Sequence, residues 1–66
     1  MDNRLFEKKI EYIIHALERC GYDPYTQLSE YLRTGDPLYI TRQDDARKLI
    51  QFLDHDSILH YLNTHF

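Results

Sequence analysis

Two Gly and Asp-Pro groupings interrupt the middle of this chain and limit every helix it can form. The first is Gly21-Tyr22-Asp23-Pro24 and the second is Gly35-Asp36-Pro37. A glycine ends a helix readily because it accepts the left-handed backbone conformation. An Asp followed by Pro begins one, because the carboxylate accepts backbone N–H groups and the proline ring fits the first helical position. The chain is therefore expected to stop and restart a helix twice, with Asp23 and Asp36 as caps.

Hydrophobic periodicity around these breaks predicts an all-α fold of four helices and one short 3-10 turn. The helices are expected over residues 5–20, 24–33 and 42–53, with a last helix capped by Asp54 or Asp56, and the turn over 38–40. Each helix carries apolar residues three or four apart, which is the spacing of one helical face. No segment alternates as a strand does. We expect residues 1–66 to form a single small helical domain.

The first helix has the longest apolar stripe. Its members are Phe6, Ile10, Ile13, Ile14, Leu17 and Cys20. We expect Cys20 to be a structural thiol in this stripe, since the negative end of a helix does not activate a cysteine. As the only cysteine it cannot form an internal disulfide, which fits a reducing compartment.

Thr41 and Asp44 predict how the helix over 42–53 begins. Thr41 is the expected N-cap, and Asp44 lies three residues later, where a capping box usually has a Glu. Asp44 and Asp45 also suit the positive end of a helix dipole. This assignment explains both acids as structural residues, without a cation site.

A chain of 66 residues forms only a small core. It buries about 60% of the surface that its unfolded form exposes, so folds of this size usually need a staple, a metal or a partner. Six tyrosines and three phenylalanines favour self-association, because aromatic side chains dominate interface energetics. We expect a homodimer, with Tyr25, Tyr31, Tyr39 and the first helix supplying core and dimer contacts.

The charge balance argues against nucleic-acid binding. Eleven acids against eight bases give a net charge of −3, and no basic stripe could neutralise a run of phosphates. No apolar run approaches the roughly 20 residues of a membrane span, and no secretory segment follows the N-terminus. We expect a cytoplasmic protein that binds neither nucleic acid nor membrane. The alternative is a small helical DNA-binding or transcription-modulating protein, since a helix pair can place one helix in a groove.

No catalytic motif is present in the sequence. It has no Gly-rich phosphate loop, no H-E-x-x-H motif and no nucleophile elbow. His55, His60 and His65 recur at intervals of five, whereas a helical metal pair uses three or four. We therefore predict no catalytic residue, no metal and no cofactor. A metal-dependent activity at these histidines is a third hypothesis.

Arg42 and Arg47 are the residues that capping leaves unexplained. They lie five apart around the expected helix start, and guanidinium groups commonly pair with carboxylates or phosphates through their planar fork. One interpretation is internal, with Arg47 paired to Glu30 or Asp36. The other is a partner-binding anion clamp formed by both arginines. The sequence leaves both open.

The same region carries a resemblance to a known family. The run GYDP…Q…YL…GDPLYI…R…DDAR…I, over residues 21–50, resembles the GYNPxxQ…YLx(S/T)GDPAYIPRxNDARxxIR signature of the IreB family of small regulatory phosphoproteins of Gram-positive bacteria. The resemblance implies a cytoplasmic, all-helical homodimer without enzymatic activity. It also implies a role in peptidoglycan synthesis under a membrane Ser/Thr kinase and its phosphatase, in related members through proteolytic turnover of an early precursor enzyme. Functionally important signature arginines correspond to Arg42 and Arg47.

The chain departs from the family pattern at several positions. Thr41 replaces the Pro after Ile40, Asp44 replaces the Asn of NDAR, and Gln51 stands in place of a third arginine. Family members carry phospho-acceptor threonines in a tail before the first helix, and here no threonine precedes Thr26. The resemblance therefore indicates a truncated paralogue that keeps the dimer fold without kinase control, and it leaves any phosphorylation site open.

Overall fold

The computed structural model describes residues 3–66, and the regular structure of this part is entirely helical. Its elements, in chain order, are α1 (Asn3–Arg19), α2 (Pro24–Thr34), the 3-10 turns η1 (Pro37–Tyr39) and η2 (Gln43–Asp45), α3 (Ala46–Ile50) and α4 (His55–His65). The prediction of an all-α fold is confirmed, although the described residues contain a second 3-10 turn. No described helix is long and apolar enough to cross a membrane.

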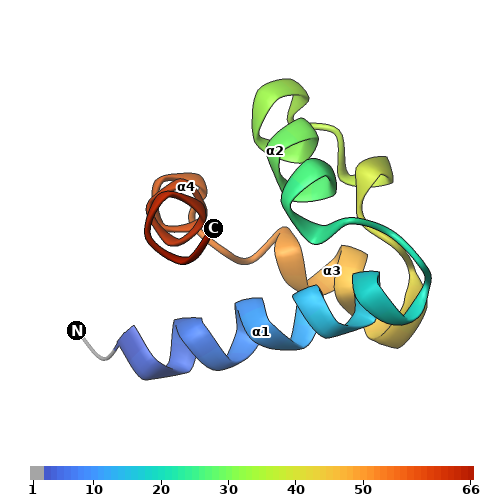
Figure 1. Ribbon diagram of the computed structural model, residues 1–66, viewed down its shortest axis with the longest axis horizontal. Coiled ribbons are helices and arrows are strands. Elements are labelled where there is room, and N and C mark those ends of the chain that lie inside the picture. The colour runs from blue at the N-terminus through green and yellow to red at the C-terminus, as the bar shows by residue number, and fades with distance from the viewer. Residues whose placement is uncertain (1–2) are drawn as a thin grey trace.

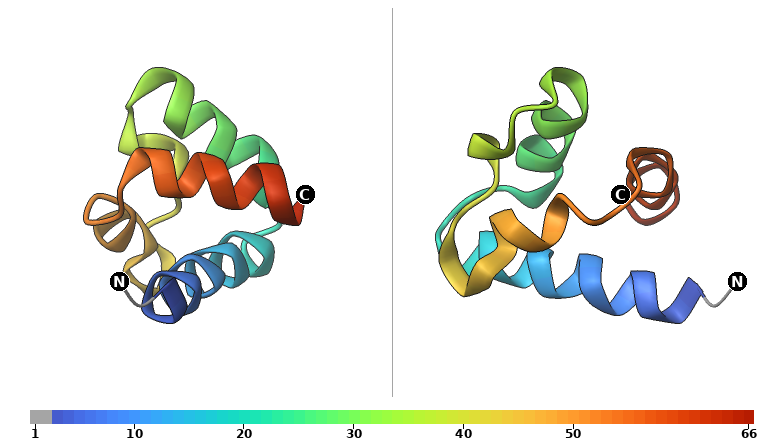
Figure 2. Two further views of the ribbon diagram at one scale, coloured as in Figure 1. Left: turned by 90° about the vertical axis from the view of Figure 1, so that its left-hand side faces the viewer. Right: turned by 180° about the vertical axis from the view of Figure 1, so that it is seen from behind.

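The helices pack mainly as two pairs, α1 with α3 and α2 with α4. In Figure 1, α1 runs along one edge, α3 covers its C-terminal half, and α2 lies on the opposite side of the molecule. α4 lies across from the N-terminal half of α1, beside α2, as Figure 2 also shows. The principal packing contacts join α1 to α3 and α2 to η1 and α4.

The core lies where these elements meet, and every helix contributes to it. Its largest fully buried side chains are Ile10, Ile13 and Leu17 of α1, Leu28 of α2, Ile50 of α3, Ile58 of α4 and Ile40 from the connection before η2. Burial of each such side chain is worth roughly 1.5–3 kcal/mol. Ile40 therefore anchors the connection between η1 and η2 in the same core as the helices.

The Gly and Asp-Pro groupings form helix ends in the structure. Gly35 has a φ of 72°, in the left-handed region, and ends α2. Asp23 is the N-cap of α2 and accepts a hydrogen bond from Thr26 N at 3.2 Å. Asp36 accepts a bond from Leu38 N at 3.0 Å at the start of η1. α2 and η1 therefore begin at the two Asp-Pro pairs.

The helix expected over residues 42–53 is wrong. The chain forms η2 first, and α3 spans only Ala46–Ile50. Two consecutive residues interrupt the helix, because Asp44 has a φ of 55° and Asp45 a φ of 61°. Among residues other than glycine, aspartate tolerates this left-handed conformation well. The two acids therefore break the helix that they were expected to begin.

The capping box expected between Thr41 and Asp44 does not form. The Thr41 hydroxyl instead accepts a hydrogen bond from Gln43 N at 3.1 Å, which closes a turn around Arg42. The Asp44 carboxylate forms an ion pair with Arg19 at the end of α1. Asp44 thus ties the left-handed segment to the first helix.

Cys20 lies outside the core, contrary to the prediction. α1 ends at Arg19, and Gly21 turns the chain away with a φ of 84°, so the apolar stripe does not continue to Cys20. The thiol is exposed, and its Sγ lies 3.4 Å from Thr41 Oγ1.

α4 carries apolar residues on two sides. Its buried side chains are Ile58, Tyr61 and Leu62. Leu59 and Phe66 are about half exposed, and the Phe66 ring packs on Tyr25 of α2 with 5.6 Å between ring centroids. Asp54 caps the helix by accepting a bond from Ser57 N at 3.0 Å.

Candidate functional site

Arg42 and Arg47 flank the kinked segment that replaces the expected helix. Ile40 precedes this segment and Ala46 follows the kink, and both are fully buried. Within it, Asp45 N donates a hydrogen bond to Arg42 O at 3.2 Å. The backbone that carries the two arginines is therefore fixed at both ends by core packing.

Arg47 is half-buried and contributes one N–H group to the fold. Its Nε donates to Ile40 O at 2.9 Å. Next to this bond, Gln27 Nε2 of α2 donates to Tyr39 O at 2.8 Å. Side chains from two different helices thus donate to two consecutive carbonyl groups, one at the end of η1 and one directly after it. No regular helix provides a hydrogen-bond partner for these carbonyl groups.

The internal ion pair considered for Arg47 does not form. Glu30 pairs with Arg33, one turn further along α2, and the hydrogen bond from Arg33 lowers the pKa of Glu30 below its ordinary value. The Asp36 carboxylate accepts the backbone N–H of Leu38. The remaining N–H groups of Arg47 have no partner among the residues that the structure describes.

Arg42, Arg47 and Lys48 line one shallow depression. Its volume is about 190 Å³, and Asp45 and Gln51 complete the lining. Arg42 and Lys48 are exposed, and their side chains form no bond with any other described residue. Three cations against one carboxylate give the depression a positive potential. The forked guanidinium groups fit a planar anion such as a carboxylate.

Three lining residues were not predicted as site residues. Lys48 follows Arg47 directly, and Gln51 donates from Nε2 to Arg47 O at 3.0 Å, one helical turn later. Gln51 lies four residues after Arg47, a spacing that brings two residues together on one helical face, whereas the position of Lys48 directly after Arg47 gave no such signal. Asp45 could not be foreseen, because its place depends on the left-handed kink.

The three histidines considered for a metal do not form one cluster, although His60 and His65 line the same hollow between α1 and α4. His55 Nε2 lies 3.2 Å from the Tyr31 hydroxyl, and the His65 ring stacks on Tyr61 with 3.9 Å between ring centroids. In the described part of the chain, no three His, Cys, Asp or Glu side chains are grouped so that they could hold a metal ion.

A family model described as IreB regulatory phosphoprotein matches residues 1–66. The chain belongs to the IreB family. The match extends well beyond the signature at residues 21–50 and includes the sequences of α1 and α4. Membership supports a regulatory role for this IreB protein and, with it, protein partners.

The structure assigns many residues of the IreB signature to the fold. Asp23 and Asp36 accept backbone bonds at helix starts, Gln27 donates to a backbone carbonyl, and Arg47 does so through Nε. Arg42, by contrast, forms no side-chain bond with any described residue. Capping and backbone support therefore explain much of the signature, and Arg42 remains available for another molecule.

The threonine hydroxyls within the signature region also serve the fold. Thr26 Oγ1 donates to the Asp23 carboxylate, Thr34 Oγ1 donates to Glu30 O at 2.7 Å, and Thr41 Oγ1 accepts a backbone N–H. A phosphate on any of the three would replace a bond that holds a helix end or a turn.

Proposed function

We propose that this IreB protein is a non-enzymatic regulator that acts in the cytoplasm as a homodimer and binds another protein through Arg42 and Arg47. The process that it regulates is peptidoglycan synthesis downstream of a Ser/Thr kinase, and its partner belongs to the kinase pathway or to the proteolytic machinery. The observation that carries the binding part of the proposal is the basic depression, where the side chains of Arg42 and Lys48 have no partner in the described structure.

The chemistry of the depression favours an acidic partner surface. Exposed ion pairs are worth only about 0.2–1 kcal/mol each, so a partner gains useful affinity by engaging Arg42, Arg47 and Lys48 together. Asp45 lies in the same lining and repels a carboxylate that approaches from its side. This arrangement favours one orientation of the partner over others.

A charge-matched pair of variants tests this surface. Arg42→Gln with Lys48→Gln removes two cations from the depression. Arg33→Gln with Lys8→Gln removes the same two residue types from other exposed positions. We expect the first variant to bind the native partner about tenfold more weakly and the second to bind it as the unchanged protein does. Partner capture from the host, followed by affinity measurement on the captured protein, supplies the readout. Equal binding by both variants would refute the proposed surface.

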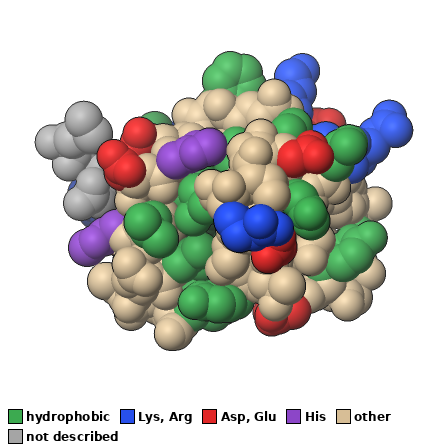
Figure 3. Space-filling view, turned by 90° about the horizontal axis from the view of Figure 1, so that it is seen from above, with side chains coloured by type: hydrophobic (Ala, Val, Ile, Leu, Met, Phe, Trp, Pro, Cys, Tyr) green, Lys and Arg blue, Asp and Glu red, His purple; other side chains and the backbone are tan. Residues whose placement is uncertain are grey.

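An exposed apolar strip supports the homodimer part of the proposal. Leu59 lies on α4, and Phe66, seven residues later, is the C-cap residue of that helix, so the two lie on one side of it. Tyr25 packs against Phe66. All three are about half exposed. Hydrophobic side chains lie at the surface on the side of α2, among scattered charged groups (Figure 3). A second copy could cover this strip.

Sedimentation equilibrium tests the strip with a second matched pair. Leu59→Ser with Phe66→Ser is expected to yield a folded monomer at micromolar concentration. Leu38→Ser with Phe52→Ser removes one Leu and one Phe that are 70% and 77% exposed elsewhere, and it is expected to leave the dimer intact. A well-folded monomer of the unchanged protein at that concentration would refute the dimer itself.

A further inference from the structure

A second and larger hollow lies between α4 and the N-terminal half of α1. Its volume is about 550 Å³, within the range of ligand-binding pockets, and it shares no lining residue with the basic depression. It exists because α3 ends at Ile50 and covers only the C-terminal half of α1 (Figures 1 and 2). Beyond that point α1 and α4 face each other without a third helix between them.

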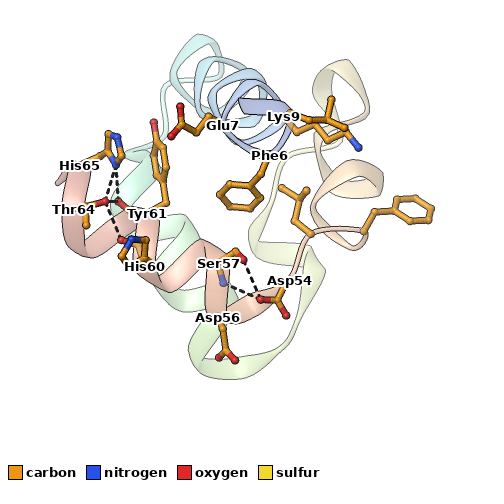
Figure 4. Close-up of a pocket in the computed structure, with 13 residues that line it drawn as sticks. Phe6, Glu7, Lys9, Asp54, Asp56, Ser57, His60, Tyr61, Thr64 and His65 are labelled. Carbon is orange, nitrogen blue, oxygen red and sulfur yellow. Dashed lines mark hydrogen bonds between the residues drawn. The ribbon is translucent and has the colours of Figure 1, made fainter. Parts of the chain in front are cut away.

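The groove has an apolar lining with exposed apolar edges. Figure 4 shows the Phe6 ring extending from α1 toward α4, where it meets Tyr61 edge-on with 6.4 Å between ring centroids. Leu53 lies beside them and is nearly buried, whereas Leu5 and Phe52 are 58% and 77% exposed. Leu5 and Phe52 therefore leave apolar side chains exposed at the edges of the groove.

The charged side chains that line the groove are mostly acidic. Glu7 comes from α1, and Asp54 and Asp56 come from the start of α4, against the ammonium group of Lys9. The lining also includes the imidazoles of His60 and His65. Asp54 caps α4, but the carboxylates of Glu7 and Asp56 form no hydrogen bond or ion pair with other described residues. The groove therefore presents free acceptors around an apolar centre.

The electrostatics of Tyr61 agree with this acidic lining. Burial raises the pKa of its phenol, and the nearby carboxylates of Glu11 and Glu7 raise it further. Of these two carboxylates, Glu7 belongs to the lining of the groove.

We propose that this groove docks a peptide segment of a partner protein, one that presents large apolar side chains flanked by Lys or Arg. The apolar side chains bury against Phe6, Leu53 and Tyr61, and the flanking cations meet Glu7 and Asp56. The volume accommodates a few large side chains, which is what an amphipathic segment inserts into a groove. This surface is opposite in charge to the Arg42 depression, so the two select chemically different partners.

The lining of the basic depression argues against that surface of a second copy as the occupant. The depression is lined by Arg42, Arg47 and Lys48. The remaining lining residues there are Asp45 and Gln51, so that surface carries no apolar side chain to fill the hollow. A basic segment with apolar anchors, supplied by another protein, satisfies both requirements.

Two model peptides test the proposal on the full, isotope-labelled chain. The first is a twelve-residue peptide of Leu and Lys with its leucines spaced as on one helical face, and the second carries Glu at every Lys position. We expect the Lys peptide to shift the backbone amide signals of groove residues such as Phe6 and Leu53. Calorimetry should show it binding at least about tenfold more tightly than the Glu peptide.

Variants with matched charge locate the contact. Glu7→Gln with Asp56→Asn removes two free acceptors from the groove, and we expect it to weaken binding of the Lys peptide about fivefold to tenfold. Glu18→Gln with Asp45→Asn makes the same chemical changes at exposed positions elsewhere and should leave binding unchanged. Arg42→Gln with Lys48→Gln should also leave it unchanged, which separates this groove from the proposed regulatory surface.

Several results would overturn the proposal. They are equal affinity for both peptides, absence of binding at millimolar concentration, amide shifts confined to other surfaces, or equal losses in the two acid-neutralised variants. Amide shifts at the groove when the protein alone is diluted would show that a second copy occupies it, and would overturn the proposal as well.

Discussion

Replacing Arg47 by Met tests whether this arginine supports the fold as well as the basic depression. Met keeps an unbranched apolar stem but removes the Nε–H that donates to Ile40 O at 2.9 Å. No other described donor bonds this carbonyl, and it belongs to a residue whose side chain is fully buried. The substitution therefore leaves an acceptor without its partner at the entrance to the kinked segment.

The expected loss follows from the burial of this bond. Hydrogen bonds from charged groups contribute about 1.5–3 kcal/mol, and an unsatisfied buried acceptor costs about 1–3 kcal/mol. Because Arg47 is only half-buried, water can partly replace it, which places the loss at about 1–2 kcal/mol. For a chain this small, such a loss lowers Tm by about 4–16 °C.

Urea unfolding followed by far-UV circular dichroism measures this loss. The matched control is Arg42→Met, which removes the same charge and the same head group from a side chain without a described bond. We expect Arg42→Met to stay within about 0.5 kcal/mol of the unchanged protein, with the same dependence on urea. All three proteins are compared at one concentration, since self-association would add to their apparent stability.

The reasoning is refuted if the two variants unfold at the same urea concentration. In that case the bond to Ile40 O does not support the fold, and Arg47 acts only at the surface. If instead Arg47→Met is destabilised and Arg42→Met is stable but binds the partner more weakly, the two roles are separated. Arg47 is then a structural arginine and Arg42 a recognition arginine within one signature.

Two further predictions concern α4 and the buried tyrosines. Asp54→Ala is expected to destabilise the fold by about 1 kcal/mol because its carboxylate accepts Ser57 N, whereas Asp56→Ala should have a much smaller effect in the same urea experiment. Burial raises the pKa of Tyr31 and Tyr61 above the ordinary value of 10.0. The free energy of unfolding should therefore stay constant up to about pH 10 and decrease as the pH rises further through the folded-state pKa values. Titration of the phenolate absorbance checks this, since Tyr31→Phe and Tyr61→Phe should each remove one late-ionising group.

The elements that the sequence predicts well are those whose signals are local. α2 lies between Asp23-Pro24 and Gly35, and its caps act within three residues of these positions. α1 was placed within about two residues at each end, because its apolar stripe is long and its stop is a glycine. Of the residues assigned to this first helix, only Cys20 lies outside it, one residue past its end.

The helix over 42–53 could not be excluded from its local sequence. Two acids after Thr41 are typical of a helix start, and the same two acids also tolerate left-handed backbone. The ion pair from Asp44 to Arg19 joins positions 25 residues apart, and Ile40 and Ala46 are buried in the core on either side of the kink. Neither the kink nor the depression that it forms is visible without these long-range contacts.

The acidic groove was not predicted, for a related reason. Phe6, Leu53 and Tyr61 each fit the apolar stripe of their own segment, and stripes of this kind predict core residues. They line a hollow because α3 ends early and leaves half of α1 without a covering helix. The lengths of neighbouring helices, and not the residues themselves, create that surface.

The left-handed conformation of Asp44 and Asp45 affects the relative directions of the Arg42 and Arg47 side chains. In an unbroken α-helix successive residues turn by about 100°, so side chains five apart diverge by about 140°. With the pair in place, Arg42 and Arg47 line the same depression. Asn or Gly at 44 and 45 would keep that convergence, and Val at both would oppose it, because β-branched residues resist positive φ. Backbone handedness at two acidic positions therefore controls whether the two arginines line one surface, while every basic residue stays unchanged.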